Sequence, residues 1–221
     1  MVPDPNRAAL LNYNSQVTLQ VSDLGLSQRS AATSHTGGVH QISSYQVQTN
    51  ISSLTMSAIT LYKNNDLTGE NSKFIDDNFD LSPYGYDRKM GSMSVQGNPW
   101  VTYSEAQFKG DENLYTKGSY KDITDDAKFM SMKLIKDLKS PRITLFKKTG
   151  FVDEHIELDE HTTLPLGYQV ASYKVHSGAW CLFEFQGNTG KKHVAFKGEN
   201  VADCHSIDFD NYPASLEPVK P

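Results

Sequence analysis

The stretch Trp100-Val101-Thr102-Tyr103 leads to Phe108-Lys109-Gly110 and then to Ser131-Met132-Lys133-Leu134. About eighty residues later the same order returns as Trp180-Cys181-Leu182-Phe183, Gly190 and Ser215-Leu216-Glu217-Pro218. In both copies an aromatic residue is followed seven residues later by glycine, and a serine opens the last predicted strand. This recurrence indicates a β-structured unit that was duplicated.

Short alternations of apolar and polar residues are frequent, and they are typical of half-buried strands. Examples are Ile59-Thr60-Leu61-Tyr62 and Ile143-Thr144-Leu145-Phe146, with turn-forming clusters such as Gln96-Gly97-Asn98-Pro99 between strands. We therefore predict an all-β protein of antiparallel sandwiches, with one-turn helices near 122–126 and 200–205. The expected core residues are Tyr62, Phe74, Leu81, Trp100 and Phe108 in the first half, and Leu145, Phe146, Leu158, Trp180 and Phe183 in the second.

Aligning on the recurrence gives four units in the order A, B, A, B. They cover 59–96, 100–136, 143–176 and 180–219, so the chain is predicted to hold two domains joined around 137–142. We place the first domain at 57–138 and the second at 139–221, after an N-terminal Ser/Thr-rich extension at 1–56. A chain of 221 residues is long enough for this arrangement.

On these residues the chain resembles the βγ-crystallin superfamily, whose domains pair two Greek-key motifs. The resemblance covers roughly 57–221 and implies two tandem Greek-key sandwiches. It also implies that each glycine holds a positive-φ position in a folded hairpin, which only glycine adopts at low cost. The third unit departs from the pattern, because Asp153 stands where glycine is expected. The matching residues are Tyr62 with Gly69, Tyr103 with Gly110, Phe146 with Phe151, Phe183 with Gly190, and the serines Ser92, Ser131, Ser172 and Ser215.

The extension at 1–56 has two interpretations. Its segment 41–47 reads much like 169–175, which favours a degenerate fifth Greek key without its aromatic residue and glycine. The alternative is a flexible Ser/Thr-rich arm that contains one strand-like run. An ordered but unpaired fifth unit would pack on the first domain or self-associate.

The resemblance raises the question of calcium binding. Many members of the family bind calcium through the motif Asn/Asp-Asn/Asp-x-x-Ser/Thr-Ser, in which the hydroxyl of the first Ser/Thr contacts the ion. Calcium takes six to eight oxygen ligands. The four positions of that hydroxyl are here Gly91, Met130, Ala171 and Ala214, so every unit lacks it, and Arg88 adds positive charge to the first. Only Asp210 and Asn211 keep the acidic pair. We expect calcium binding to be lost or weak, with these two residues as a degenerate site.

A second candidate metal site is the alternating run Asp153, His155, Glu157, Asp159 and His161, because imidazoles and carboxylates hold zinc. Ligands two apart on one strand lie about 6–7 Å from each other, which is wide for chelation by one strand. A solvated edge face that discourages sheet-edge pairing explains the same pattern. If the run lies on a strand, Val152, Ile156 and Leu158 are among the residues that face inward.

Several function classes lack their sequence signatures. No nucleophile elbow, His-Glu-x-x-His, phosphate loop or Cys-x-x-Cys occurs, so we expect no catalysis. The net charge of −5 and the absence of a basic run disfavour nucleic acid. Lysines gather near the predicted linker, at Lys133, Lys136, Lys139, Lys147 and Lys148 with Arg142, and we interpret them as a solvated hinge. No apolar run suits a transmembrane helix.

Cys181 and Cys204 are too few for a disulfide framework, and we expect reduced thiols. No secretory signal is visible at the N-terminus, which slightly favours a cytoplasmic location.

The resemblance implies a non-enzymatic structural or stress-related protein that self-associates or stays monomeric. The alternative is a recognition or adhesion module that binds glycans or cell surfaces, or forms part of a pore-forming assembly, with Tyr84, Tyr86 and Tyr115 as exposed contacts. A calcium-binding protein is the third interpretation.

Overall fold

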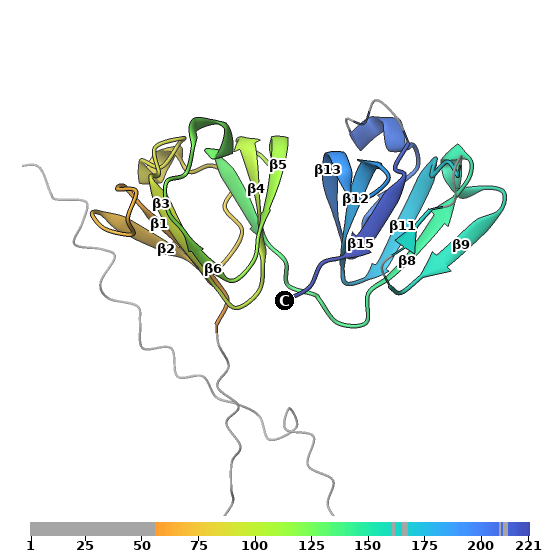
Figure 1. Cartoon of the computed structure of the whole chain (residues 1–221), viewed down its shortest axis with the longest axis horizontal. Helices are drawn as coiled ribbons and strands as arrows, with labels where there is room; N and C mark the ends of the chain where they lie inside the picture. The colour runs from red at the N-terminus through yellow and green to blue at the C-terminus, as the bar shows by residue number, and fades with distance from the viewer. Residues whose placement is uncertain (1–55, 161, 165–167, 208, 210–211) are drawn as a thin grey trace, which may run out of the picture. The chain divides into compact units, whose positions relative to one another are not determined.

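The computed structural model describes residues 56–160, 162–164, 168–207, 209 and 212–221 (Figure 1). The predicted extension at 1–56, with its strand-like run at 41–47, lies outside the described residues except for Met56. Within them the chain is all-β, with four antiparallel sheets, short 3-10 turns and no α-helix. The fold class predicted from the sequence is confirmed.

The strands of the first two motifs form two sheets. The first has the order β2-β1-β3-β6 and the second the order β5-β4-β7. Their strands are β1 (Ala58–Tyr62), β2 (Asn71–Phe74), β3 (Ser92–Gln96), β4 (Trp100–Glu105), β5 (Lys109–Tyr115), β6 (Gly118–Tyr120) and β7 (Ser131–Leu134), with 3-10 turns η3 (Ser82–Tyr84) and η4 (Asp125–Ala127).

The two motifs exchange their third strands. β6 follows β5 in the chain but pairs with β3 of the preceding motif, and Asn78 of that motif forms an isolated bridge with Met132 in β7. Each sheet therefore contains one element from the other motif. Neither motif can complete its sheet alone, which makes the pair one domain.

The second domain repeats this exchange. Its sheets have the orders β14-β11-β8-β9 and β10-β15-β12-β13, so β10 and β14 are the exchanged strands. The elements are β8 (Arg142–Phe146), β9 (His155–Leu158), β10 (Thr162–Thr163), β11 (Ser172–Ser177), β12 (Ala179–Phe185), β13 (Thr189–Phe196), β14 (Asn200–Val201) and β15 (Ser215–Pro218), with η5 (Thr149–Phe151) and η6 (Cys204–Ile207).

Each strand-opening serine is fully buried and fastens the folded hairpin of its own motif. Its hydroxyl donates a hydrogen bond to the carbonyl of one hairpin residue. The same hydroxyl accepts a hydrogen bond from the amide of the residue three positions after that carbonyl, and this second residue has φ between 59° and 64°. The sets of carbonyl, serine and amide residue are Asn64/Ser92/Leu67, Glu105/Ser131/Phe108, Lys148/Ser172/Phe151 and Phe185/Ser215/Asn188. The serine thus satisfies two backbone groups that the hairpin cannot pair itself.

The predicted positive-φ position is present in all four hairpins. Gly69, Gly110 and Gly190 have φ of 82°, 80° and 81°, and Asp153 has φ of 74°. A Cβ at Gly110 would lie 2.2 Å from the Ser104 hydroxyl, so this glycine is also required by space. Asp153 therefore adopts the same hairpin conformation as the glycines, at the backbone cost of an L-residue in the left-handed region.

The predicted cores are partly correct. Leu81, Trp100, Leu145 and Trp180 are fully buried, and Phe74 is 9% exposed. Tyr62, Phe146 and Leu158 are only half-buried, because they lie at strand ends or on an edge strand. Phe108 and Phe183 do not lie between the sheets of a domain but belong to a third apolar cluster described below.

Candidate functional site

A third apolar cluster joins the two domains. The first domain contributes Val101, Tyr103 and Ile135, and the second contributes Ala179, Cys181, Phe183, Val194 and Val219, all at most 9% exposed. Trp100 and Thr102 of β4 point into the first domain, so Val101 and Tyr103 point to the opposite face. Both faces of β4 and of β12 are consequently buried.

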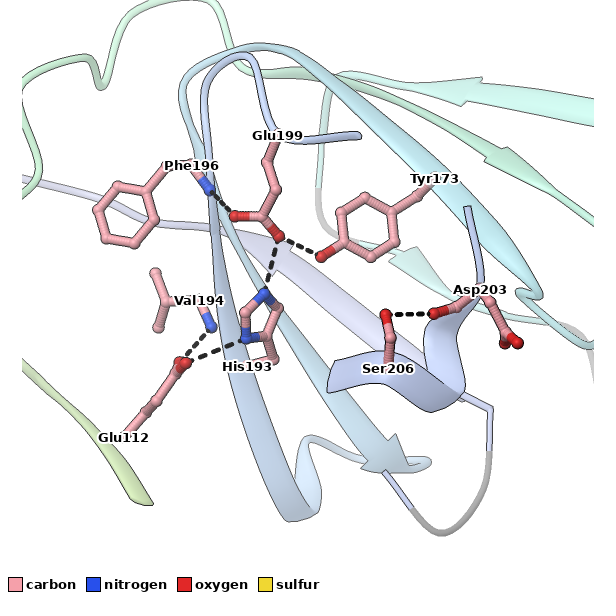
Figure 2. A network of polar contacts seen from close by, with 8 residues as sticks. All are labelled: Glu112, Tyr173, His193, Val194, Phe196, Glu199, Asp203 and Ser206. Carbon is pink, nitrogen blue, oxygen red and sulfur yellow. Dashed lines mark hydrogen bonds and ion pairs between the residues drawn. The ribbon is translucent and has the colours of Figure 1, made fainter. Parts of the chain in front are cut away.

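A polar network crosses the same interface (Figure 2). His193 on β13 contacts Glu112 on β5 through Nδ1 at 3.1 Å and Glu199 through Nε2 at 2.8 Å. The other Glu112 oxygen accepts the Val194 amide at 2.8 Å, and the Tyr173 hydroxyl donates to Glu199. Glu112 is the member from the first domain, so the network bonds one domain to the other.

The network is largely removed from water, since the side chains of His193, Glu112 and Glu199 are 16%, 14% and 26% exposed. Burial disfavours the imidazolium, but hydrogen bonds to Glu112 and Glu199 outweigh it and raise the pKa of His193 to about 9. Burial opposes the charge on Glu199, yet hydrogen bonds from His193 and Tyr173 hold its pKa below the usual range. A protonated His193 between two carboxylates is therefore the form present at neutral pH.

The four calcium-hydroxyl positions occupy equivalent places. Gly91, Met130, Ala171 and Ala214 each donate their amide to the carbonyl of the aromatic residue of their own hairpin, at 2.9 Å. Those aromatic residues are Tyr62, Tyr103, Phe146 and Phe183. The alignment of the units is thereby confirmed, and at all four places the sequence supplies a side chain without an oxygen.

The first stretch is also closed to a replacement hydroxyl. A Cβ at Gly91 would lie 2.7 Å from the Lys63 carbonyl oxygen and 2.6 Å from the Asn64 carbonyl carbon. Nearby, Arg88 Nη2 donates to the Asp125 carbonyl at 3.2 Å, and Lys128 pairs with the Asp125 carboxylate at 2.7 Å. The carbonyl oxygen and one carboxylate oxygen of Asp125 are thus already bonded to cationic side chains. Asp210 and Asn211, the candidate calcium pair, lie outside the described residues.

Comparison with known proteins supports the same reading. A family model described as Beta/Gamma crystallin matches residues 58–135, the first pair of motifs. The first domain therefore matches the βγ-crystallin superfamily, as the resemblance in the sequence predicted. It is 27% identical over 169 residues to Epidermal differentiation-specific protein of Cynops pyrrhogaster, a match that covers 75% of this chain and 50% of that protein. It is 27% identical to Beta-crystallin A2 of Bos taurus, over 70% of this chain and 84% of that one.

The chain thus spans half the length of the Cynops relative. A solved structure, Geodin from Geodia cydonium, matches 74% of this chain and 99% of its own with 16% identity and a TM-score of 0.34. The fold assignment rests on the exchanged strands and the family match, not on that superposition.

The described members of the candidate zinc run, Asp153, His155, Glu157 and Asp159, do not converge on one point. His155 stacks on Phe146 with ring centroids 5.5 Å apart, and Asp153 pairs with Lys148 at 2.8 Å. β9 is an edge strand with Glu157 exposed, as the alternative interpretation expects, and His161 lies outside the described residues. Val152 was predicted to face inward, but it is 53% exposed because it precedes the strand. In the described part of the chain no three His, Cys, Asp or Glu side chains are grouped to hold a metal.

Several of the lysines near the linker contact carboxylates or aromatic rings of this chain. Lys136 pairs with Asp76 at 2.7 Å, and Lys147 pairs with Glu154 at 2.6 Å. Lys133 lies over Phe108 at 4.4 Å and over Phe196 of the second domain at 5.3 Å. Lys133 is therefore part of the interface between the domains.

Both thiols are free and buried. Burial raises the pKa of each of Cys181 and Cys204 to about 12, so neither is a reactive thiolate at neutral pH. Cys204 and His205 lie on η6, close to the one-turn helix predicted near 200–205, and His205 bonds Asp203 instead of the thiol.

The predicted exposed aromatic residues are only partly exposed. Tyr84 is 52% exposed, but Tyr86 is fully buried and Tyr115 is half-buried against Tyr120, at 4.9 Å between ring centroids. Ile75 and Phe79, which sequence analysis overlooked, are 47% and 65% exposed. No helix of the described residues is long and apolar enough to cross a membrane.

Proposed function

We propose that this chain is a non-enzymatic structural or stress-related βγ-crystallin in which calcium binding is lost or weak. The observation that carries the proposal is the interface itself. Both faces of β4 and β12 are buried, and Glu112 and His193, which line a cavity of about 420 Å³, pair with each other across the interface. Side chains that could take part in a reaction are buried or paired with one another, which suits a long-lived structural protein.

The same proposal includes the domain limits 57–138 and 139–221, with the extension at 1–56 before them. It is supported by the two exchanged pairs of motifs, which begin at Ala58 and Arg142. The degenerate pair Asp210 and Asn211 belongs to it as a weak calcium contact at most.

The thermal unfolding midpoint in excess EDTA and in millimolar calcium tests the calcium part of the proposal. An ion that binds only the folded state stabilises it by RT ln(1 + [L]/Kd). We expect the two midpoints to agree within about one degree. A rise of several degrees in calcium would support the alternative, a calcium-binding protein.

Recognition is a second candidate function, favoured by a specific surface. A hollow of about 440 Å³ beside the edge strand β2 is lined by Phe74, Ile75, Asp76, Asp77 and Tyr84 among others. Exposed apolar side chains at such a hollow are typical of binding sites. A glycan array and a pull-down with immobilised cells separate the classes, because a purely structural protein binds neither.

A further inference from the structure

The hydrogen bonding at His193 requires a proton on each ring nitrogen. Both nitrogens face a carboxylate, with Glu112 at 3.1 Å and Glu199 at 2.8 Å. A neutral imidazole has one N–H and one lone pair, so it can donate to only one of these carboxylates. Loss of the proton would leave a lone pair facing a carboxylate inside an interface with little water.

The other hydrogen bonds described around His193 do not bridge the two carboxylates. Tyr173 on β11 already donates to Glu199, and the Val194 amide already occupies the second oxygen of Glu112. Asp111 on β5 and Lys191 and Lys192 on β13 line the adjoining cavity of about 420 Å³, and Glu184 on β12 is buried and accepts the Lys191 amide. None of these bonds joins Glu112 to Glu199.

We propose that the proton on His193 is a latch that holds the two domains together. With the proton, Glu112 of the first domain and Glu199 of the second are bridged by one cation. Without it, the two carboxylates face the interface with no charge between them, and like charges in a partly dehydrated site repel strongly. The domain pair is therefore closed at neutral pH and opens on the alkaline side.

The thiols provide a built-in reporter of opening. Cys181 is 3% exposed and belongs to the interdomain cluster, whereas Cys204 is 1% exposed inside the core of the second domain. Opening of the interface exposes Cys181 and leaves Cys204 covered. Because the pKa of both thiols is about 12, the rise in thiolate with pH is common to both and cancels in their ratio.

The experiment is pulsed alkylation of the full chain with iodoacetamide between pH 7 and 10, with Cys181 and Cys204 peptides quantified by mass spectrometry. We expect the ratio of Cys181 to Cys204 labelling to stay constant to about pH 8 and to rise toward tenfold by pH 10, as the protonated form is lost. Histidine NMR on the same samples should show His193 titrating near 9.

The variant Glu112→Gln keeps an acceptor for the Val194 amide and can donate its own amide proton to a neutral His193. We expect its labelling ratio to be independent of pH, with the His193 pKa lowered by about one unit or more. Glu105→Gln removes an exposed carboxylate from the same sheet and should retain the wild-type rise. A constant ratio in the wild type, or a rise in Glu112→Gln equal to that of the wild type, would overturn the latch.

Discussion

Replacing Ser172 with alanine should destabilise the second domain by breaking its hairpin fastening. The hydroxyl accepts the Phe151 amide at 3.1 Å and donates to the Lys148 carbonyl at 2.6 Å, and the serine is fully buried. Each lost hydrogen bond costs about 1 kcal/mol, and a buried group left unpaired costs about 1–3 kcal/mol. Since the hairpin also holds Phe151 at φ 62° and Asp153 at φ 74°, we expect a total loss of about 2–4 kcal/mol.

Urea unfolding followed by tryptophan fluorescence measures this loss. Each domain has one buried tryptophan, Trp100 in the first and Trp180 in the second, so a Trp100→Phe background reports the second domain alone. Glu157→Ala, at an exposed residue on β9 in the same sheet as Ser172, is the control and should change the unfolding free energy by less than about 0.5 kcal/mol. Equal effects of the two alanine substitutions would refute the role of the buried hydroxyl.

Three further outcomes are expected. Asp153→Ala should be about 1 kcal/mol less stable than Asp153→Gly in urea unfolding, because alanine at φ 74° is strained and glycine is not; equal stability would contradict the strain. Gly91→Ala should lose about 1–3 kcal/mol in urea unfolding followed by Trp100 fluorescence in a Trp180→Phe background, since its Cβ meets backbone atoms; a neutral effect would mean that the Lys63–Asn64 backbone shifts to make room. The folded pKa of His193 lies above its unfolded value of 6.5, so its contribution of about 3 kcal/mol is complete below pH 6.5 and is lost as pH rises through 9; unfolding free energies that do not change from pH 6 to 10 would contradict this.

The repeat made most of the fold predictable. An aromatic residue and a strand-opening serine mark the same hairpin in all four units, and a glycine seven positions after the aromatic residue marks it in three, because each residue meets a fixed backbone need. The glycine supplies positive φ, and the serine pairs two orphaned backbone groups. In the third unit Asp153 replaces the glycine, and it can do so because aspartate is among the non-glycine residues that adopt left-handed φ most readily.

The network around His193 could not be predicted in the same way. Glu112, His193 and Glu199 belong to no motif, and Glu112 is separated from His193 by 81 positions in the chain. Their proximity depends on how one domain packs on the other, which local periodicity does not encode. The exposure of Tyr84 and Tyr86 could not be predicted for a similar reason. Tyr84 is the last residue of η3 and Tyr86 follows it outside any strand, so the alternation of a strand does not apply to them.

A signal for the interface was nevertheless present in the sequence. The opening strands of the first and third motifs alternate apolar and polar residues, with the half-buried Thr60 between Ile59 and Leu61 in β1 and the buried Thr144 between Ile143 and Leu145 in β8. The opening strands of the second and fourth motifs are nearly continuous apolar runs, β4 beginning with four buried residues and β12 with six. A continuous apolar run indicates a strand covered on both faces. A single domain covers only one face of its sheet, so the second and fourth motifs had to meet another surface, and in this chain they meet each other.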